Sequence, residues 1–380
     1  MGKNGTLSII IIMAGAIAAF TIGSGFSTGQ EVLQYFASYG FWGVFGTSAV
    51  LLLMLVVGFM TFAKIGHDQQ FKKPTEIFYY LGGKFLGTLL DYFYIVYMFL
   101  LFTMMIAGGG ALFEEHYSIS KYVGGVVVAA VVSATAWFGL RNLIGIIGRI
   151  GPLIVVIAIG LGTFGVINGS DGLINGNRVV SDLDILQGSS HWLLAGISYA
   201  GVVIMMLAPF VGALGKRITS RRLAIGGGAM GGVMFTTGCL IVGLGVLANI
   251  SRVYDVDIPL LVIARDFHPI VASLISVMIL AGIYTTAVPL LWSVASRFYD
   301  DSTTGFKTVT IVSAVIGSIV GLLVPFAQLV NWIYSASGYI GAFVLLLAVV
   351  HLIFGRGRRD KRSVPVETVV PAKDQTVDAV

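Results

Sequence analysis

The first apolar stretch of the sequence holds a glycine cluster that is followed closely by a carboxylate. Gly23, Ser24 and Gly25 interrupt the stretch, and Gln30 and Glu31 come shortly after them. A break in a membrane helix frees backbone amide and carbonyl groups, which are tolerated at that depth only where they are buried in protein or line a cavity. An ionisable side chain inside a membrane is costly and marks a functional site by default. We therefore predict that the freed backbone groups bind a ligand and that Glu31 has a functional role.

Three roles suit Glu31: binding of a substrate ammonium group, gating of the outer entrance, and transfer of a proton. Two plainer interpretations stay open. The glycines would equally suit a close packing face, because small residues let membrane helices approach one another. Glu31 would simply reach water if it lies close to the outer mouth of the protein.

A second group of oxygen atoms is predicted in the eighth apolar stretch. Gly282, Thr285 and Thr286 are spaced so that they share one face of a helix. Their carbonyl and hydroxyl groups, with carbonyls of a broken first helix, would supply about five oxygen ligands, which suits a hard cation such as Na⁺. The alternative is that both threonine hydroxyls donate to carbonyls of the preceding turn.

Two further stretches contribute candidate residues. Tyr97 lies near the middle of the third stretch, where it would either pack or line a substrate pocket. Tyr199 and Gly201 lie near the middle of the sixth stretch, where small residues would allow a second break. The sequence contains no metal-ligand spacing, nucleophile–base pair or phosphate loop, so we do not expect an enzyme.

The composition of the 380 residues requires a membrane environment for these elements. Hydrophobic residues make up 57% and charged residues only 11%, with 50 glycines. Soluble chains carry about 25% charged residues, so a soluble cytosolic enzyme is excluded. The net charge of +5 does not indicate nucleic-acid binding, because the basic residues flank apolar stretches. The expected surroundings are a lipid bilayer.

The apolar stretches predict an all-α polytopic protein. A spanning helix needs about 20 mostly apolar residues. Ten stretches meet this requirement, at approximately 7–37, 41–63, 85–112, 122–139, 143–167, 190–213, 222–248, 269–298, 306–325 and 332–354.

Ten spans divide into two inverted halves of five, which is typical of secondary transporters with broken helices at matching positions. We expect a first repeat at 1–168, a second at 169–354, broken helices 1 and 6, and a disordered cytoplasmic tail at 355–380.

The basic residues predict the orientation. With the N-terminus inside, all but four of the 23 lysines and arginines fall on the inner face. Both termini are therefore expected in the cytoplasm, in a multi-pass protein of a bacterial inner membrane. The outer loop 250–268 has alternating charges around Ile258, Pro259 and Leu260, which indicates an amphipathic helix lying over the outer vestibule.

Two motifs resemble a known family. The run from Thr21 to Glu31, TIGSGFSTGQE, and the run from Leu280 to Ala287, LAGIYTTA, are similar to signatures of the YkvI-like bacterial membrane proteins. That family resembles the amino acid–polyamine–organocation superfamily, whose members have the LeuT fold. The resemblance covers residues 5–354, and it implies a sodium-coupled symporter.

The resemblance also implies which residues bind the ion and the substrate. The carbonyls of Ala19, Ile22 and Gly282 and the hydroxyls of Thr285 and Thr286 would hold Na⁺. Substrate would lie between helices 1, 3, 6 and 8, which nominates Gly23, Ser24, Gly25, Gln30, Glu31, Tyr97, Tyr199 and Gly201.

The sequence thus predicts Na⁺-coupled symport, by alternating access, of a small amino acid or a related organic amine or zwitterion. A proton-coupled transporter using Glu31 is the nearest alternative, and a channel or a non-transporting receptor is another. The identity of the small-molecule substrate and the oligomeric state are not encoded in any feature of the sequence.

Overall fold

A computed structural model of the chain describes residues 3–137, 144–300 and 303–354. These residues form α-helices and short 3-10 helices, with no strand among them. The helices are α1 (Lys3–Thr21), α2 (Ser24–Thr28), α3 (Gln30–Tyr35), η1 (Ala37–Tyr39), α4 (Gly40–Gln69), α5 (Glu76–Tyr117), α6 (Lys121–Trp137), α7 (Ile144–Asn168), α8 (Gly172–Val179), η2 (Val180–Asp182), α9 (Trp192–Arg217), α10 (Arg221–Leu247), α11 (Ile250–Val253), α12 (Pro259–Phe267), α13 (Pro269–Ala295), α14 (Thr304–Leu323) and α15 (Phe326–Phe354).

The all-α class predicted from the sequence is confirmed. Within the described residues, seven helical segments are long and apolar enough to cross a membrane, or eight if the bent pair formed by Leu153–Asn168 and Gly172–Asp182 counts as one span. Two shorter apolar helices, at Leu7–Thr21 and Lys121–Trp137, add to these. The number of ten spans and the division into two repeats stay predictions, and the predicted tail lies outside the described residues.

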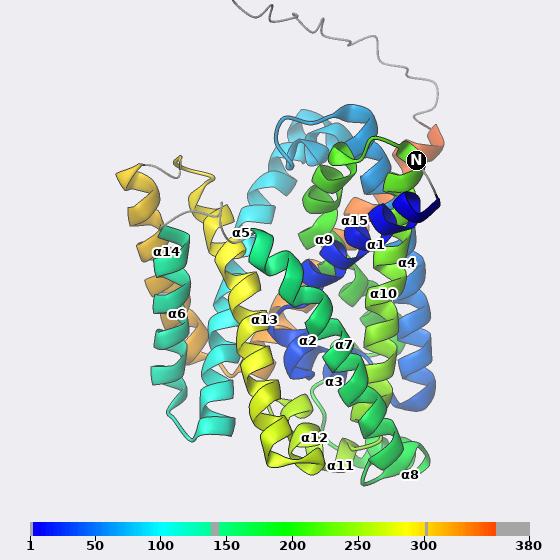
Figure 1. The fold of residues 1–380 in the computed structure, drawn as a ribbon, viewed down its shortest axis with the longest axis vertical. Coiled ribbons are helices and arrows are strands. Elements are labelled where there is room, and N and C mark those ends of the chain that lie inside the picture. The colour runs from blue at the N-terminus through cyan, green and yellow to red at the C-terminus, as the bar shows by residue number, and fades with distance from the viewer. Residues whose placement is uncertain (1–2, 138–143, 301–302, 355–380) are drawn as a thin grey trace, which may run out of the picture.

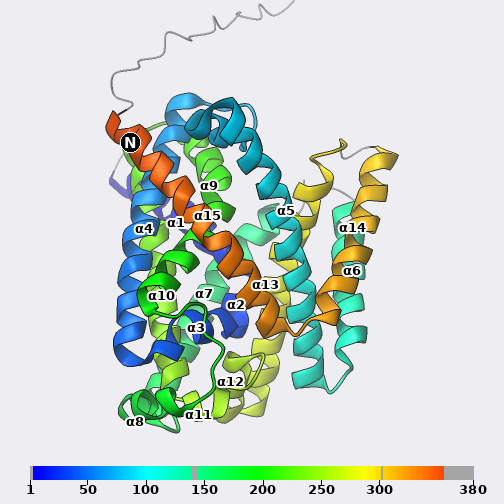
Figure 2. The same cartoon turned by 180° about the vertical axis from the view of Figure 1, so that it is seen from behind.

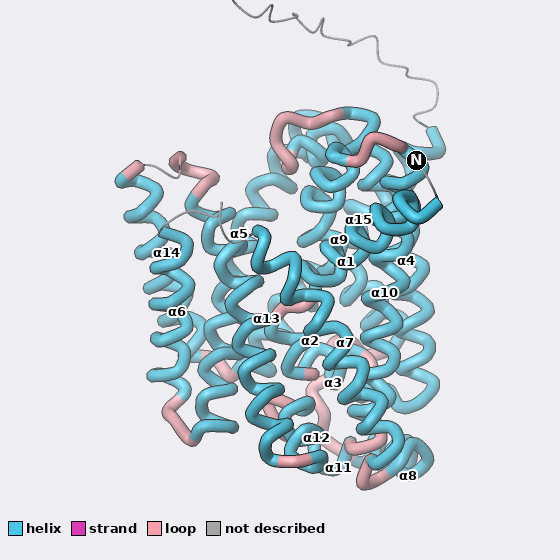
Figure 3. The backbone as a smooth tube through the Cα atoms, in the orientation of Figure 1, coloured by secondary structure: helices cyan, strands magenta, loops and turns pink. Residues whose placement is uncertain are grey.

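The long helices form two groups that meet around the short helices α2 and α3 (Figure 1). In one group α4 packs against α9 and α10, and α1 packs against α10. In the other, α5 packs against α6, α13 and α14. Helix α15 crosses α9 and also contacts α5, so it joins the two groups (Figure 2). Most loops lie at the two ends of the molecule (Figure 3).

The predicted break in the first helix is confirmed. Helix α1 ends at Thr21 and α2 begins at Ser24, so that Ile22 and Gly23 are non-helical between them. A second interruption follows at Gly29, whose φ of 88° lies in the left-handed region that favours glycine. The chain therefore passes through the centre of the molecule as two very short helices.

The predicted break in the sixth span is wrong. Helix α9 is continuous through Tyr199 and Gly201. A Cβ atom added to Gly201 would lie 1.7 Å from the carbonyl oxygen of Gly338 in α15, and one added to Gly341 would lie 1.8 Å from the carbonyl oxygen of Gly201. The small residues of α9 therefore allow two continuous helices to cross at very short range, which is the second role that glycine has in membrane helices.

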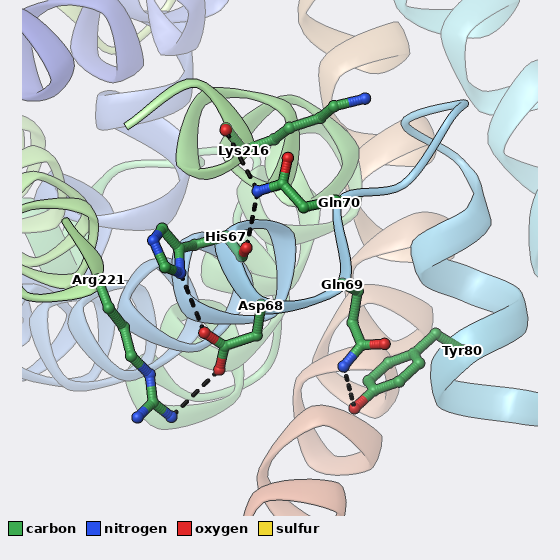
Figure 4. Close-up of polar contacts among 7 residues, drawn as sticks. All are labelled: His67, Asp68, Gln69, Gln70, Tyr80, Lys216 and Arg221. Atoms are coloured by element: carbon green, nitrogen blue, oxygen red, sulfur yellow. Dashed lines mark hydrogen bonds and ion pairs between the residues drawn. The ribbon is translucent and has the colours of Figure 1, made fainter. Parts of the chain in front are cut away.

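Polar contacts tie the helices together at the end of the molecule that carries the N-terminus (Figure 1). Asp68, at the end of α4, pairs with Arg221 at 3.1 Å and contacts His67 at 3.0 Å. Gln70 follows at φ 51° and donates to the Lys216 carbonyl at 3.4 Å (Figure 4). The end of α4 is thus bound both to α9 and to α10.

Candidate functional site

Glu31 of α3 lies at the centre of the candidate site. Its side chain is 3% exposed. The Tyr199 hydroxyl donates to Oε2 at 2.8 Å, and the Tyr334 hydroxyl donates to Oε1. In the described part of the chain no lysine, arginine or histidine pairs with this carboxylate. Glu31 is therefore a buried acid held by two phenols that come from α9 and α15.

Aromatic rings form the wall around this acid. The ring centroids of Tyr35, Tyr199 and Tyr334 lie 5.6 to 6.0 Å from one another. Phe36 packs edge-on against Tyr199, with centroids 5.2 Å apart. These rings exclude water, so a charge on the site interacts more strongly with a bound ion or substrate than it would in solvent.

The missing side chains of Gly23 and Gly25 leave space beside the break, and the Glu31 carboxylate lies against Gly25. A Cβ atom on Gly25 would lie 1.7 Å from Oε1 of Glu31. At Gly23 the neighbours are Met105 Cε at 3.0 Å and Thr286 Cγ2 at 3.7 Å, so this position is tight but less restricted. Any side chain at position 25 would thus displace the carboxylate from its present position.

Hydroxyl groups add hydrogen bonds to two carbonyls of the glycine cluster. Ser27 Oγ donates to the Gly23 carbonyl at 2.8 Å, and Thr28 Oγ1 donates to the Gly25 carbonyl at 3.0 Å. The same carbonyls also accept backbone amides, from Ser27 at 3.2 Å and from Gly29 at 3.1 Å. Both carbonyls are therefore fully satisfied within the buried protein.

The residues predicted to hold a cation lie partly together. Thr286 Oγ1 donates to the Ile22 carbonyl at 3.1 Å, so α13 contacts the break directly. Thr285 Oγ1 instead donates to the Gly282 carbonyl of its own helix at 3.1 Å, which is the alternative that the sequence left open. Both threonines are buried, and so is Ala19, near the end of α1.

The other predicted substrate residues lie in different surroundings. The Tyr97 hydroxyl donates to the Val202 carbonyl of α9 at 3.1 Å, next to the crossing formed by Gly201. Gln30 is 3% exposed, and its Oε1 atom has no hydrogen-bond partner. The side chain of Ser24 lies outside the described residues. The structure thus groups Gly25, Glu31 and Tyr199, while Gly201 faces α15.

Tyr334 is the functional candidate that the sequence analysis missed. It lies near the start of the last apolar stretch, where a tyrosine suits the membrane interface equally well. Next to it, Asn331 Nδ2 donates to Oε1 of Gln34 at 3.3 Å, and Gln34 Nε2 donates to the Ala327 carbonyl at 2.8 Å. The polar residues in the first turns of this span were the sequence signal that could have indicated a role for Tyr334.

Sequence comparisons find two similar proteins, both of Bacillus subtilis (strain 168). No protein-family model matches it. It is 22% identical over 329 residues to the membrane protein YkvI of Bacillus subtilis (strain 168), covering 85% of this chain and 90% of YkvI. It is 20% identical over 341 residues to YyaD of the same organism, covering 88% of this chain and 94% of YyaD.

Structure comparisons find similar folds among solved structures. MhsT in complex with L-phenylalanine has a TM-score of 0.63 at 15% identity, covering 92% of this chain and 89% of MhsT. A Na⁺-coupled sialic acid symporter in a substrate-bound outward-open state has a TM-score of 0.61 at 14% identity, covering 91% of this chain and 79% of the symporter.

Mhp1, a nucleobase-cation-symport-1 family transporter, has a TM-score of 0.61 at 13% identity, covering 92% of this chain and 79% of Mhp1. These likenesses extend over nearly the whole chain, and they confirm the fold expected from the two motifs. The protein is a multi-pass membrane protein with the LeuT fold, related in sequence to YkvI and YyaD.

Proposed function

We propose that this protein is a secondary transporter that couples the uptake of a small amino acid, or a related organic amine or zwitterion, to Na⁺. The observation that carries the proposal is the contact between Thr286 and the Ile22 carbonyl at the break. The hydroxyl of one helix and a carbonyl freed by another meet there in a buried position, as a site for a hard cation requires. The similar folds of two cation symporters support the same assignment.

In this proposal Na⁺ binds among the carbonyls of Ala19, Ile22 and Gly282 and the hydroxyls of Thr285 and Thr286. The ion would replace the present Thr286 hydrogen bond, and it would order the break between α1 and α2. The backbone around Gly23 to Gly25 and the Glu31 carboxylate then bind the substrate. The group around α1, α4, α9 and α10 moves against the group around α5, α6, α13 and α14 to expose the site alternately.

Uptake into proteoliposomes tests this assignment. Concentrative uptake is expected with an inward Na⁺ gradient, and both Thr286→Ala and Thr285→Ala should raise the Na⁺ concentration that gives half-maximal uptake. Thr310→Ala is the matched control, because this buried threonine donates to the Phe306 carbonyl within α14 and lies on another helix. Uptake that ignores Na⁺ would overturn the coupling ion, and flux that merely follows the substrate gradient would indicate a channel.

Proton coupling through Glu31 is the second candidate. It is favoured by one observation, the burial of the carboxylate with two phenols and no cationic partner among the described residues. An imposed pH gradient without Na⁺ would then drive uptake, and Glu31→Gln would abolish that uptake while leaving exchange of bound substrate intact. If Glu31→Gln keeps full pH-driven uptake, Glu31 does not carry the coupled proton.

A further inference from the structure

A pocket of about 490 Å³ opens beside α3, at the end of the molecule that carries α11 and α12 (Figure 1). We call it the vestibule pocket. Its polar lining residues include Gln30, Glu115, Asp184, Asp255, Asp257 and Gln328. Leu33 and Gln34 lie on the same face of α3 as Gln30, so this face forms one wall, while Glu31 points from another face toward α9 and α15.

The vestibule pocket is lined by carboxylates of three separate segments. Glu115 comes from the end of α5, Asp184 from the loop after η2, and Asp255 and Asp257 from the loop between α11 and α12. The residues that line the pocket include no lysine, arginine or histidine. A cleft lined by charges of one sign concentrates counter-ions and raises their rate of association.

Two of these carboxylates accept hydrogen bonds from backbone amides, and two do not. Glu115 Oε1 accepts the Asp257 amide at 2.8 Å, and Asp257 Oδ1 accepts the Ala327 amide at 3.3 Å. Burial raises the pKa of Asp257 above its ordinary value. Asp184 and Asp255 are exposed and have no hydrogen bond or ion pair among the described contacts.

Gln30 supplies an independent sign of a ligand. Its side chain is 97% buried and lines the vestibule pocket, yet Oε1 has no hydrogen-bond partner. Buried polar groups are almost always satisfied, so an orphan acceptor next to a pocket indicates a missing donor. A ligand in the vestibule pocket that carries N–H groups would supply this donor.

We propose that the vestibule pocket binds an organic cation through its N–H groups, and that the transported substrate is an amine of net positive charge. This inference narrows the substrate class of the proposed function, and it rests on that function. No three histidine, cysteine, aspartate or glutamate side chains among the described residues converge closely enough to hold a metal ion. A cationic amine satisfies Gln30 Oε1 and the free carboxylates together, and Glu31 lies one residue farther along α3 to receive it.

A zwitterion fits this pocket less well. Its own carboxylate would face the exposed carboxylates of Asp184 and Asp255, with no lysine, arginine or histidine in the lining to accept it. Like charges placed together discriminate between ligands by repulsion, in the way that specific interfaces do. The pocket therefore selects by charge before the substrate reaches Glu31.

Binding to the purified full chain tests this proposal without requiring transport. Butane-1,4-diamine and 4-aminobutanoate share a four-carbon backbone and differ in one charged end, and each is titrated at constant ionic strength. The diamine is expected to bind at least about tenfold more tightly. Asp184→Asn combined with Asp255→Asn should weaken the diamine about fivefold and leave 4-aminobutanoate unaffected or strengthened.

The control variant combines Asp182→Asn with Asp300→Asn, because it removes two exposed carboxylates that do not line the pocket. Gln30→Met keeps the size of the side chain but removes its acceptor, so it should also weaken the diamine. Three results would each overturn the proposal. The first is equal binding of the two compounds, and the second is an equal loss of diamine binding in the control variant. The third is displacement of the diamine by NaCl and KCl beyond the effect of ionic strength.

Uptake separates this inference from the proposed function. Gradient-driven uptake of 4-aminobutanoate with exclusion of the diamine would overturn the cationic substrate and support transport. Selective binding of the diamine that is lost in the Asp184 and Asp255 variant, without uptake under any gradient, would support the cation site and overturn transport.

Discussion

The carboxylate of Glu31 accepts a hydrogen bond from the hydroxyl of Tyr334, which follows it by 303 residues in the chain. This bond joins α3, beside the break, to α15, which crosses both helix groups. A second phenol, that of Tyr199, holds the other carboxylate oxygen from α9. One buried acid thus connects three helices that lie far apart in the sequence.

Removal of either phenol is expected to destabilise the protein. Tyr334→Phe and Tyr199→Phe each leave a buried carboxylate oxygen with one donor fewer, at a cost of about 1–3 kcal/mol. Tyr284→Phe is the matched control, because its hydroxyl donates to the neutral Thr135 hydroxyl at 3.0 Å and the loss should be smaller. Thermal unfolding in detergent measures the three variants. Equal losses of stability in the three variants would show that the hydrogen bonds to Glu31 contribute no more than a hydrogen bond between neutral groups.

Gly25→Ala is expected to abolish substrate binding in a folded protein. The added methyl group would occupy the position of Glu31 Oε1, since the two would be 1.7 Å apart. The carboxylate must then leave its two phenols. Gly160→Ala is the control, because a Cβ atom there meets nothing within 4 Å. Retained binding in Gly25→Ala would mean that the substrate does not depend on the present position of Glu31.

Gly201→Ala distinguishes a close helix crossing from a hinge. The crossing predicts a loss of about 1–3 kcal/mol in stability or more, because the new methyl group would collide with the backbone of Gly338. Gly212→Ala on the same helix is the control, since its nearest contact would be an ordinary 3.4 Å to Ile77. A variant that unfolds at the original temperature but has lost transport would favour the hinge.

The vestibule carboxylate Asp257 predicts a dependence of stability on pH. Its pKa is raised by burial above the ordinary value of 3.8, so between the two pKa values the folded state binds more protons than the unfolded state. Stability should therefore fall as the pH rises through this window.

Asp257→Asn keeps an acceptor for the Ala327 amide but has no charge to bury. Unfolding temperatures measured between pH 4 and pH 8 should thus fall less steeply with rising pH in this variant than in the original protein. Parallel curves would contradict the assigned cost of burying Asp257.

Much of the membrane architecture is encoded locally. A run of about 20 apolar residues can satisfy its backbone in lipid only as a helix, so the segments and the all-α class follow from composition and length. The interruption after Thr21 is favoured locally, because two glycines within three residues weaken a helix, but Gly226 to Gly228 stay helical inside α10, so glycines alone do not break a helix. The short helix predicted in the loop 250–268, α12, also begins with the Pro259 that marks a first helical turn.

Partnerships between distant residues were decided by the tertiary structure alone. Gly23 and Gly201 look alike in the sequence, yet the first lies at a break and the second packs against Gly338, because a glycine's role depends on which backbone faces it. Thr285 and Thr286 are neighbours, but rotation along the helix turns only Thr286 toward Ile22. The partner of Glu31 likewise depends on how far α15 is shifted and turned against α3, and a helix's own sequence specifies neither quantity.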